Sequence, residues 1–127
     1  NQNIFATNAA IAGHAKILNK VIIGGLSAIQ QFTTIGSYSM IGGASAVDKN
    51  IMPASLVFGN RAKLRGLNLV GLRRANFTNE EIKIEEKLHK NIEFIDTLRQ
   101  DKKFVNVIEM FENYLKLHNE KIGTVKE

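Results

Sequence analysis

Hydrophobic residues recur at every sixth position through the first half of the chain. One phase holds a large apolar side chain without a break, at Phe5, Ile11, Ile17, Ile23, Ile29, Ile35, Ile41 and Val47. A second phase holds small or β-branched side chains, at Ala9, Ala15, Val21, Ser27, Thr33, Ser39 and Ser45. This period matches neither an amphipathic helix nor, by itself, an ordinary strand. It predicts hexapeptide repeats that wind into a parallel β-helix.

A triangular coil explains the period, because each hexapeptide can supply one short side and three sides complete a turn. The large apolar residue then points inward and lies about 4.8 Å from its equivalent in the next coil. Residues eighteen positions apart should therefore stack, in columns such as Phe5–Ile23–Ile41 and Ile11–Ile29–Val47. We expect the small residue to point inward as well, and the glycines that follow the apolar position to relieve the backbone at the corners. About three coils are present, which bury a core only by stacking.

A helical period replaces the hexapeptides in the second half. Thr78 and Glu81 have the spacing of a capping box, in which each side chain bonds to the other residue's backbone N–H. Apolar residues follow at helical spacing, first at Ile84, Leu88, Ile92, Ile95 and Leu98, and after a break at 99–103 at Phe104, Ile108, Phe111 and Leu115. The pattern predicts two antiparallel helices with facing stripes, preceded by a short helix around 67–74. We interpret the stripes as structural packing and not as a cofactor site.

Composition sets the domain organisation. The chain has 127 residues, nine of its ten glycines lie between Gly13 and Gly71, and the charged residues gather in the second half. We therefore predict a β-helix over residues 1–58 and a small α-helical domain over residues 59–127. The absence of cysteine excludes a disulfide, a thiol nucleophile and a Cys-ligated metal site. The sequence has no apolar run long enough for a membrane span and no signal peptide, so we expect no membrane insertion.

Several motifs in these repeats resemble one enzyme family. They are Ala12-Gly13-His14, the block Ile22-Ile23-Gly24-Gly25-Leu26-Ser27-Ala28-Ile29-Gln30-Gln31-Phe32, Met40-Ile41-Gly42-Gly43, Gly59-Asn60 and Gly71-Leu72-Arg73-Arg74. The chain resembles the acyl-acyl-carrier-protein:UDP-N-acetylglucosamine O-acyltransferases, which open lipid A synthesis in Gram-negative bacteria. The resemblance runs from residue 1 to about residue 80, and the helical tail agrees in kind. Since the chain starts at Asn1 inside the repeats, we expect it to be the C-terminal portion of a longer protein.

The resemblance implies a fold and a reaction. The fold is a homotrimer of left-handed parallel β-helices with active sites in the clefts between subunits. The reaction moves an R-3-hydroxyacyl chain from acyl carrier protein to the 3-position of UDP-N-acetylglucosamine, in the cytoplasm and without a cofactor or a metal. The acceptor could instead be the 3-amino analogue of the sugar, which would give an amide.

Four positions match residues that the family uses for the acyl group. Gly13 matches the residue whose backbone N–H binds the thioester oxyanion, where a missing side chain leaves room for the carbonyl. His14 matches a histidine that lines the cleft. Gly43 matches the residue that ends the acyl pocket and so sets chain length, with Met40 close by.

Three further positions match residues that contact the sugar nucleotide in the family. They are Gln31, Asn68 and Arg74, and the guanidinium of Arg74 can bind phosphate oxygens. The chain departs from the family pattern close to these positions. Gln30 replaces the usual histidine, Val70 stands where an acid is common, and Ala75 stands where a second arginine often follows Arg74.

The family's general base does not match any histidine of this chain. That role suits an imidazole near neutral pH, but the family motif that supplies it lies upstream of Asn1. His14, His89 and His118 do not occupy the matching position. The chain therefore resembles the enzyme without its base, and we expect the 127 residues alone to give no acyl transfer above background.

A cluster of basic residues and a set of apolar ones point to partners. Arg61, Lys63, Arg65, Arg73 and Arg74 fall within fourteen residues that contain no acid, in a chain of net charge +5. They form either a plain solvated surface or a docking surface for the anionic acyl carrier protein. Nucleic-acid binding is not favoured, because the cluster has no aromatic residues between its charges and matches no known nucleic-acid-binding module.

Apolar residues on the outside of the coils favour a trimer. We expect Leu18, Leu26, Phe32 and Tyr38 to point outward, which is more apolar surface than a lone monomer should expose. The alternative functions are a non-catalytic trimeric scaffold and a related N-acyltransferase of the same pathway.

Overall fold

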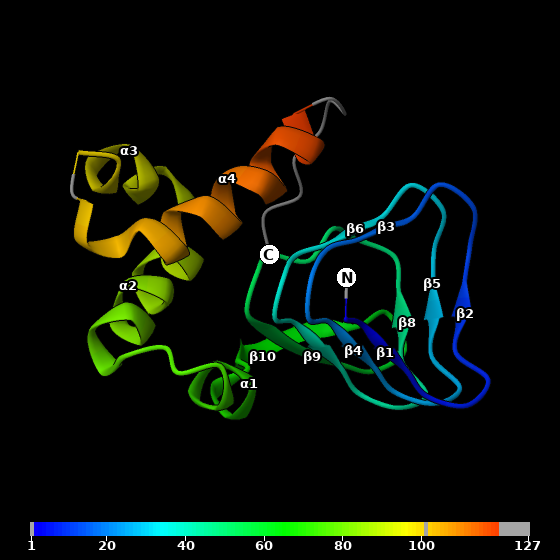
Figure 1. Cartoon of the computed structure of the whole chain (residues 1–127). Coiled ribbons are helices and arrows are strands. Elements are labelled where there is room, and N and C mark those ends of the chain that lie inside the picture. Colours follow the sequence, from blue (N-terminus) through cyan, green and yellow to red (C-terminus); the bar gives the residue numbers. More distant parts are fainter. Residues whose placement is uncertain (1, 101, 120–127) are drawn as a thin grey trace.

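The first half of the computed structural model is a left-handed parallel β-helix of about three coils, as the hexapeptide pattern and the resemblance predict (Figure 1). The structure describes residues 2–100 and 102–119. Eight two-residue strands follow one another at intervals of six: β1 (Ile4–Phe5), β2 (Ala10–Ile11), β3 (Lys16–Ile17), β4 (Ile22–Ile23), β5 (Ala28–Ile29), β6 (Thr34–Ile35), β7 (Met40–Ile41) and β8 (Ala46–Val47). They form three faces, which we call A (β1, β4 and β7), B (β2, β5 and β8) and C (β3 and β6).

The inward columns have the predicted register. Phe5 pairs with Ile23 and Ile23 with Ile41 on face A, and Ile11–Ile29–Val47 stack in the same way on face B. The members in the second and third coils are fully buried or nearly so. The last coil is shorter, because Ile41 pairs with Val57, sixteen residues later, instead of eighteen.

The corners do not depend on glycine, so that expectation is wrong. A non-glycine residue with φ between 56° and 64° stands at each corner: Gln2, Asn8, His14, Lys20, Leu26, Phe32, Tyr38 and Ala44. Hydrogen bonds between coils support this conformation, for example from Leu26 N–H to Thr7 C=O at 3.2 Å and from Ala44 N–H to Gly25 C=O at 2.8 Å. The glycines that follow the apolar position, Gly24, Gly36 and Gly42, serve close packing instead. A Cβ at each would overlap neighbouring atoms, and at Gly36 these include the backbone of Pro53.

An antiparallel strand pair closes face A. The strand β9 (Ser55–Phe58) follows β7 in parallel, and β10 (Lys63–Leu67) pairs antiparallel with β9 at the edge of the sheet. The short helix α1 (Leu69–Arg74) follows, close to its predicted place. The predicted division at residues 58 and 59 stays a prediction: Ala62 packs in the coil core, whereas Ala54 packs with the helices.

The helical part begins as predicted and then differs. The capping box of α2 (Asn79–Lys90) is confirmed, with Thr78 N–H 2.8 Å from Glu81 Oε1 and Glu81 N–H 3.1 Å from Thr78 Oγ1. The expectation of one continuous helix through Leu98 is wrong, because Asn91 leaves helical geometry at φ −151° and its side chain caps a new turn. The chain continues as η1 (Ile92–Phe94), α3 (Ile95–Leu98), η2 (Lys102–Phe104) and α4 (Val105–Asn119).

The helices lie together on one side of the β-helix (Figure 1). Helix α4 contacts both α2 and β6, and Thr34 on β6 is completely buried. The helical core includes Leu72, Leu88 and Phe111, with Tyr38 and Leu67 from the β-helix packed against it. In residues 2–100 and 102–119, none of the helices combines the length and the apolar character needed to span a bilayer.

Candidate functional site

A groove runs across the outer surface of face A. Its floor is a ladder of outward-facing apolar side chains in register, Ile4, Ile22, Met40 and Leu56. The ladder exists because the two residues of each strand point to opposite sides, so that the residue before each inward isoleucine faces out. The cavity has a volume of about 720 Å³.

Two walls enclose this floor. One is the corner column of Gln2, Lys20 and Tyr38, and the other is the segment that joins β10 to α1 and the helix itself. That second wall contributes Leu67, Asn68, Leu69, Val70, Gly71, Arg74 and Ala75. The groove thus combines an apolar floor with one exposed guanidinium, at Arg74. Such a shape suits a ligand with a hydrocarbon part and an anionic part.

Asn68 connects the groove wall to the coil. Its Nδ2 donates a hydrogen bond to the carbonyl oxygen of Tyr38 at 2.9 Å, and its Oδ1 accepts from Gly71 N–H at 3.2 Å as the N-cap of α1. A Cβ at Gly71 would overlap the Asn68 side chain. The side chain is 6% exposed and holds α1 beside the floor, while its contact to a sugar nucleotide stays a prediction.

A second group of predicted residues lies at the corner between faces B and C. Gly13 and His14 follow β2, and Gln31 occupies the equivalent corner one coil later. Open space surrounds Gly13, since a Cβ there would meet no atom within 4 Å. The imidazole of His14 stacks on the Phe32 ring, with centroids 4.9 Å apart and planes 4° apart. Gly13, His14 and Gln31 are all exposed.

One chain does not bring the two groups together. In a triangular coil, the corner between faces B and C is the vertex opposite face A, so Gly13, His14 and Gln31 point away from the groove that Met40, Asn68 and Arg74 line. Gly43 takes a third position, at the corner where face A meets face B. These predicted residues can meet at one site only if the corner of another chain lies against face A.

The chain's departures from the family pattern fall into both groups. Val70, 61% exposed, and Ala75 line the groove beside Arg74, so this wall is more apolar and less charged than the family pattern. Gln30 lines a separate cavity of about 180 Å³ with Asp48 and Arg61.

Comparison with protein families fits this architecture. The model of the family described as "Udp N-acetylglucosamine O-acyltransferase; Domain 2" matches residues 51–121, more than half of the chain. The chain belongs to the UDP-N-acetylglucosamine O-acyltransferase family.

Relatives and solved structures agree with this assignment. The acyl-[acyl-carrier-protein]–UDP-N-acetylglucosamine O-acyltransferase of Nautilia profundicola is 47% identical over 92 residues, which are 72% of this chain and 36% of that protein. The Aliarcobacter butzleri enzyme of the same name is 55% identical over 78 residues, 61% of this chain and 30% of that protein. The matched residues span about a third of the length of these curated relatives.

The solved structures extend the likeness to nearly the whole chain. The structure from Acinetobacter baumannii has a TM-score of 0.79 at 32% identity, covering 98% of this chain and 51% of that one. The UDP-N-acetylglucosamine acyltransferase of Arabidopsis has a TM-score of 0.81 at 32% identity, covering 100% and 49%.

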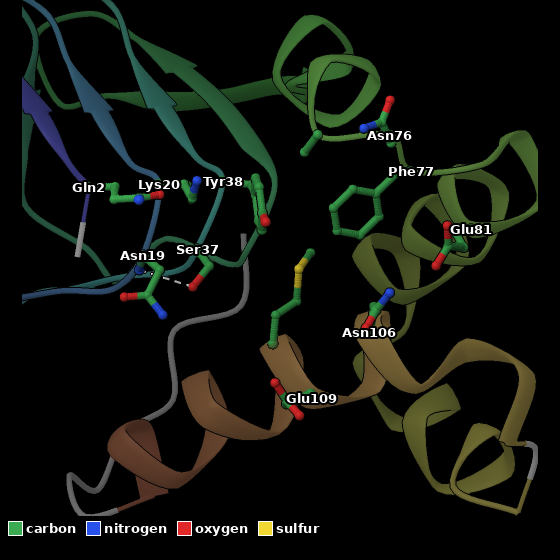
Figure 2. A pocket seen from close by; sticks show the side chains of 12 residues that line it. Gln2, Asn19, Lys20, Ser37, Tyr38, Asn76, Phe77, Glu81, Asn106 and Glu109 are labelled. Atoms are coloured by element: carbon green, nitrogen blue, oxygen red, sulfur yellow. Dashed lines mark hydrogen bonds between the residues drawn. The ribbon is translucent and has the colours of Figure 1, made fainter.

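Sequence reasoning missed a second cavity in this family member, between the β-helix and the helices. Figure 2 shows Lys20 and Tyr38 of the coil corner on one side and Phe77, Glu81, Asn106 and Glu109 on the other. Its volume is about 450 Å³. Lys20 and Tyr38 also line the groove, so this corner column separates the two cavities. No sequence pattern links residues so far apart in the chain.

The basic residues divide between two places. Arg61 and Lys63 line a cavity of about 510 Å³ with Asp48 and Lys49, while Arg73 and Arg74 stand on α1. Arg65 lies on β10, where charge also discourages pairing of an edge strand with another chain. All five side chains of the cluster are exposed. Among the described residues, no three His, Asp or Glu side chains lie close enough together to hold a metal ion.

Proposed function

We propose that this chain takes part in the transfer of an R-3-hydroxyacyl chain from acyl carrier protein to the 3-position of UDP-N-acetylglucosamine. The observation that carries the proposal is the groove of face A, with its apolar ladder and Arg74 at its wall. A hydrocarbon chain fits the ladder, and the guanidinium fits a diphosphate. Both the acyl carrier protein and the nucleotide sugar belong to the cytoplasm, where we propose that the reaction takes place.

The chain's own residues take the following roles. The sugar 3-hydroxyl attacks the thioester carbonyl, and Gly13 N–H donates a hydrogen bond to the oxyanion that forms. The attack forms the C–O bond of the ester, and the hydroxyl proton passes to the upstream histidine that the family resemblance implies. Collapse of the intermediate then breaks the C–S bond, and the same histidine returns the proton to the leaving pantetheine sulfur. His14 and Gln31 orient the acceptor, and Arg74 holds its phosphates. Exposed Arg61 and Lys63 would attract the acidic carrier protein.

We propose a homotrimer as the active assembly. Its main support is that the Gly13–His14 corner lies opposite the groove within one chain. Leu26 at 68% exposure and Phe32 at 50% add apolar surface that a partner could cover. Tyr38 does not belong to this surface, contrary to expectation, because it packs edge-on against Phe77 at 5.1 Å.

Mixed trimers test the proposal. His14→Ala and Arg74→Ala, each in the protein at its natural length, should transfer 3-hydroxyacyl groups far more slowly than the natural sequence. When the two variants are co-expressed with different tags, about a quarter of the sites should combine a native His14 corner with a native Arg74 groove from its neighbour. We expect activity near that fraction of the native rate, measured with radiolabelled UDP-N-acetylglucosamine.

The controls separate the possible failures. A mixture made from two His14→Ala preparations should stay inactive. No recovery in the mixed trimers would place His14 and Arg74 at one site of the same chain or at unrelated sites. A native protein that transfers nothing to either the 3-hydroxyl or the 3-amino sugar would favour a non-catalytic scaffold. Sedimentation of a stable monomer at micromolar concentration would contradict the trimer.

A further inference from the structure

The imidazole of His14 and the phenyl ring of Phe32 form a parallel stack. The ring centroids are 4.9 Å apart and the planes differ by 4°. The two residues are eighteen positions apart, so they occupy the same corner in successive coils. The repeat itself therefore places one ring above the other.

The stack accounts for an unusual choice of residue. Phe32 has φ 63°, a left-handed conformation that bulky side chains rarely adopt, and half of its surface is exposed. His14 has the same backbone geometry, with φ 61°. The ring of Phe32 gains little from burial at this place. Its contact with His14 is therefore what favours phenylalanine over other residues that this corner could hold.

The stack is also the contact that fixes the plane of the imidazole. Within the described part of the chain, neither ring nitrogen of His14 has a hydrogen-bond partner, and Gly13 beside it has no side chain. A ring that stacks by its face keeps its edge free, and the two nitrogen atoms lie on that edge.

We propose that Phe32 is a positioning residue for His14. The inference rests on the proposed function, in which His14 faces the acceptor in the cleft. Phe32 restricts the imidazole to one rotamer and so directs a ring nitrogen toward the substrate before it arrives. Without the phenyl ring, the imidazole is free to distribute over its other staggered rotamers.

The ring contact itself can be measured without any activity. In proton NMR of the chain, the His14 ring protons should lie upfield of their usual positions, because they sit over the face of Phe32. Phe32→Leu should return them to ordinary values, and Phe32→Tyr should keep them shifted. Ordinary positions in the natural sequence would overturn the proposal at its first step.

Kinetics of the protein at its natural length then test the role. Phe32→Leu should lower kcat about three- to tenfold with little change in the KM of either substrate, and Phe32→Tyr should restore the rate. Adding Phe32→Leu to His14→Ala should cost nothing more, because the residue to be positioned is gone. A full further loss in the double variant, or an unchanged kcat in Phe32→Leu, would overturn the proposal.

Leu26→Ala is the matched control for loss of apolar corner surface. Leu26 also has a left-handed φ, 61°, and is exposed, but it lies at the corner between faces A and B. Leu26→Ala should leave the His14 resonances where they are in the natural sequence. It should also leave unchanged the result that Phe32→Leu costs nothing more once His14 is alanine. If Leu26→Ala reproduces the kinetics of Phe32→Leu, Phe32 acts only on the assembly. Failure of the proposed function looks different, since the natural sequence would then transfer no acyl group at all.

Discussion

His89 Nε2 donates a 2.7 Å hydrogen bond to the backbone carbonyl oxygen of Pro53. The nitrogen is the donor because a carbonyl oxygen can only accept. His89 belongs to α2 and Pro53 to the last coil, and the same imidazole packs edge-on against Phe111 of α4 at 6.2 Å. One side chain thus joins the β-helix, α2 and α4. Burial lowers the pKa of His89 below its usual 6.5, and the bond to Pro53 opposes that shift.

His89→Phe should keep the ring contact and lose the hydrogen bond. The Pro53 carbonyl then lacks its partner, so we expect the free energy of unfolding to fall by about 1–3 kcal/mol at pH 7, measured by urea denaturation. Because the folded state favours neutral His89, the natural chain should also lose stability as the pH falls below 6.5. The variant should lack that part of the decline. His14→Phe, at an exposed histidine, is the control and should leave the free energy of unfolding at pH 7 unchanged.

Glu85 gives the chain a pH dependence in the opposite direction. Its side chain is completely buried in α2 and neither carboxylate oxygen has a hydrogen-bond partner. Desolvation, with a smaller contribution from Glu81, raises its pKa from 4.5 to about 8. Folding therefore takes up a proton between those values, and stability should fall as the pH rises from 4.5 to 8 and level off above. A pKa shift of this size corresponds to a loss of roughly 5 kcal/mol in the free energy of unfolding over that pH range.

Glu85→Gln should flatten this pH profile, and Glu85→Met should in addition raise the unfolding midpoint at pH 8, because it replaces the carboxylate by an apolar chain of similar size. Denaturant titrations at several pH values provide the measurement. Glu86→Gln, at the exposed neighbouring position, is the control. An unaltered profile in Glu85→Gln would mean that another group titrates.

Gly36→Ala should destabilise the β-helix by about 1–3 kcal/mol, because the added methyl group meets the backbone of Pro53, which cannot rotate away. Gly13→Ala is the matched substitution in open space and should change stability by less than about 0.5 kcal/mol. Thermal unfolding followed by circular dichroism compares them. Equal midpoints would show that neighbouring coils can separate enough to accept the methyl group.

Gly43→Met should shorten the preferred acyl donor if Gly43 ends the acyl pocket. The position is exposed, its φ lies outside the left-handed region, and a Cβ would stand 3.4 Å from Gly25 C=O, an ordinary contact. A side chain is therefore compatible with the backbone. Each lost CH₂ contact is worth about 0.8 kcal/mol, so a shift of a few carbons should reverse donor preference by orders of magnitude.

Competition between 3-hydroxyacyl donors of different length, with the protein at its natural length, measures this preference. A folded trimer with unchanged preference would remove Gly43 from the acyl site. Loss of activity on every donor would indicate a backbone effect instead.

Local patterns in the sequence determined the repeat, the inward columns and the start of α2. The pairing of Ile23 with Ile41 follows from a spacing of eighteen, and the capping box needs only Thr78 and Glu81. Both depend on neighbours at a fixed distance along the chain. The motifs around Gly13 and Gly71 likewise placed the family, since they are contiguous in sequence.

Tertiary structure alone decided what the glycines do, where the first long helix ends and how the site residues are distributed. Gly36 is close to Pro53 only because the last coil is two residues shorter, which no periodic pattern reveals. Asn68 became a cap that bonds to Tyr38, thirty residues earlier. The separation of His14 from Arg74 depends on which of three faces each residue occupies, and that is fixed by the closure of the coil and not by distance along the chain.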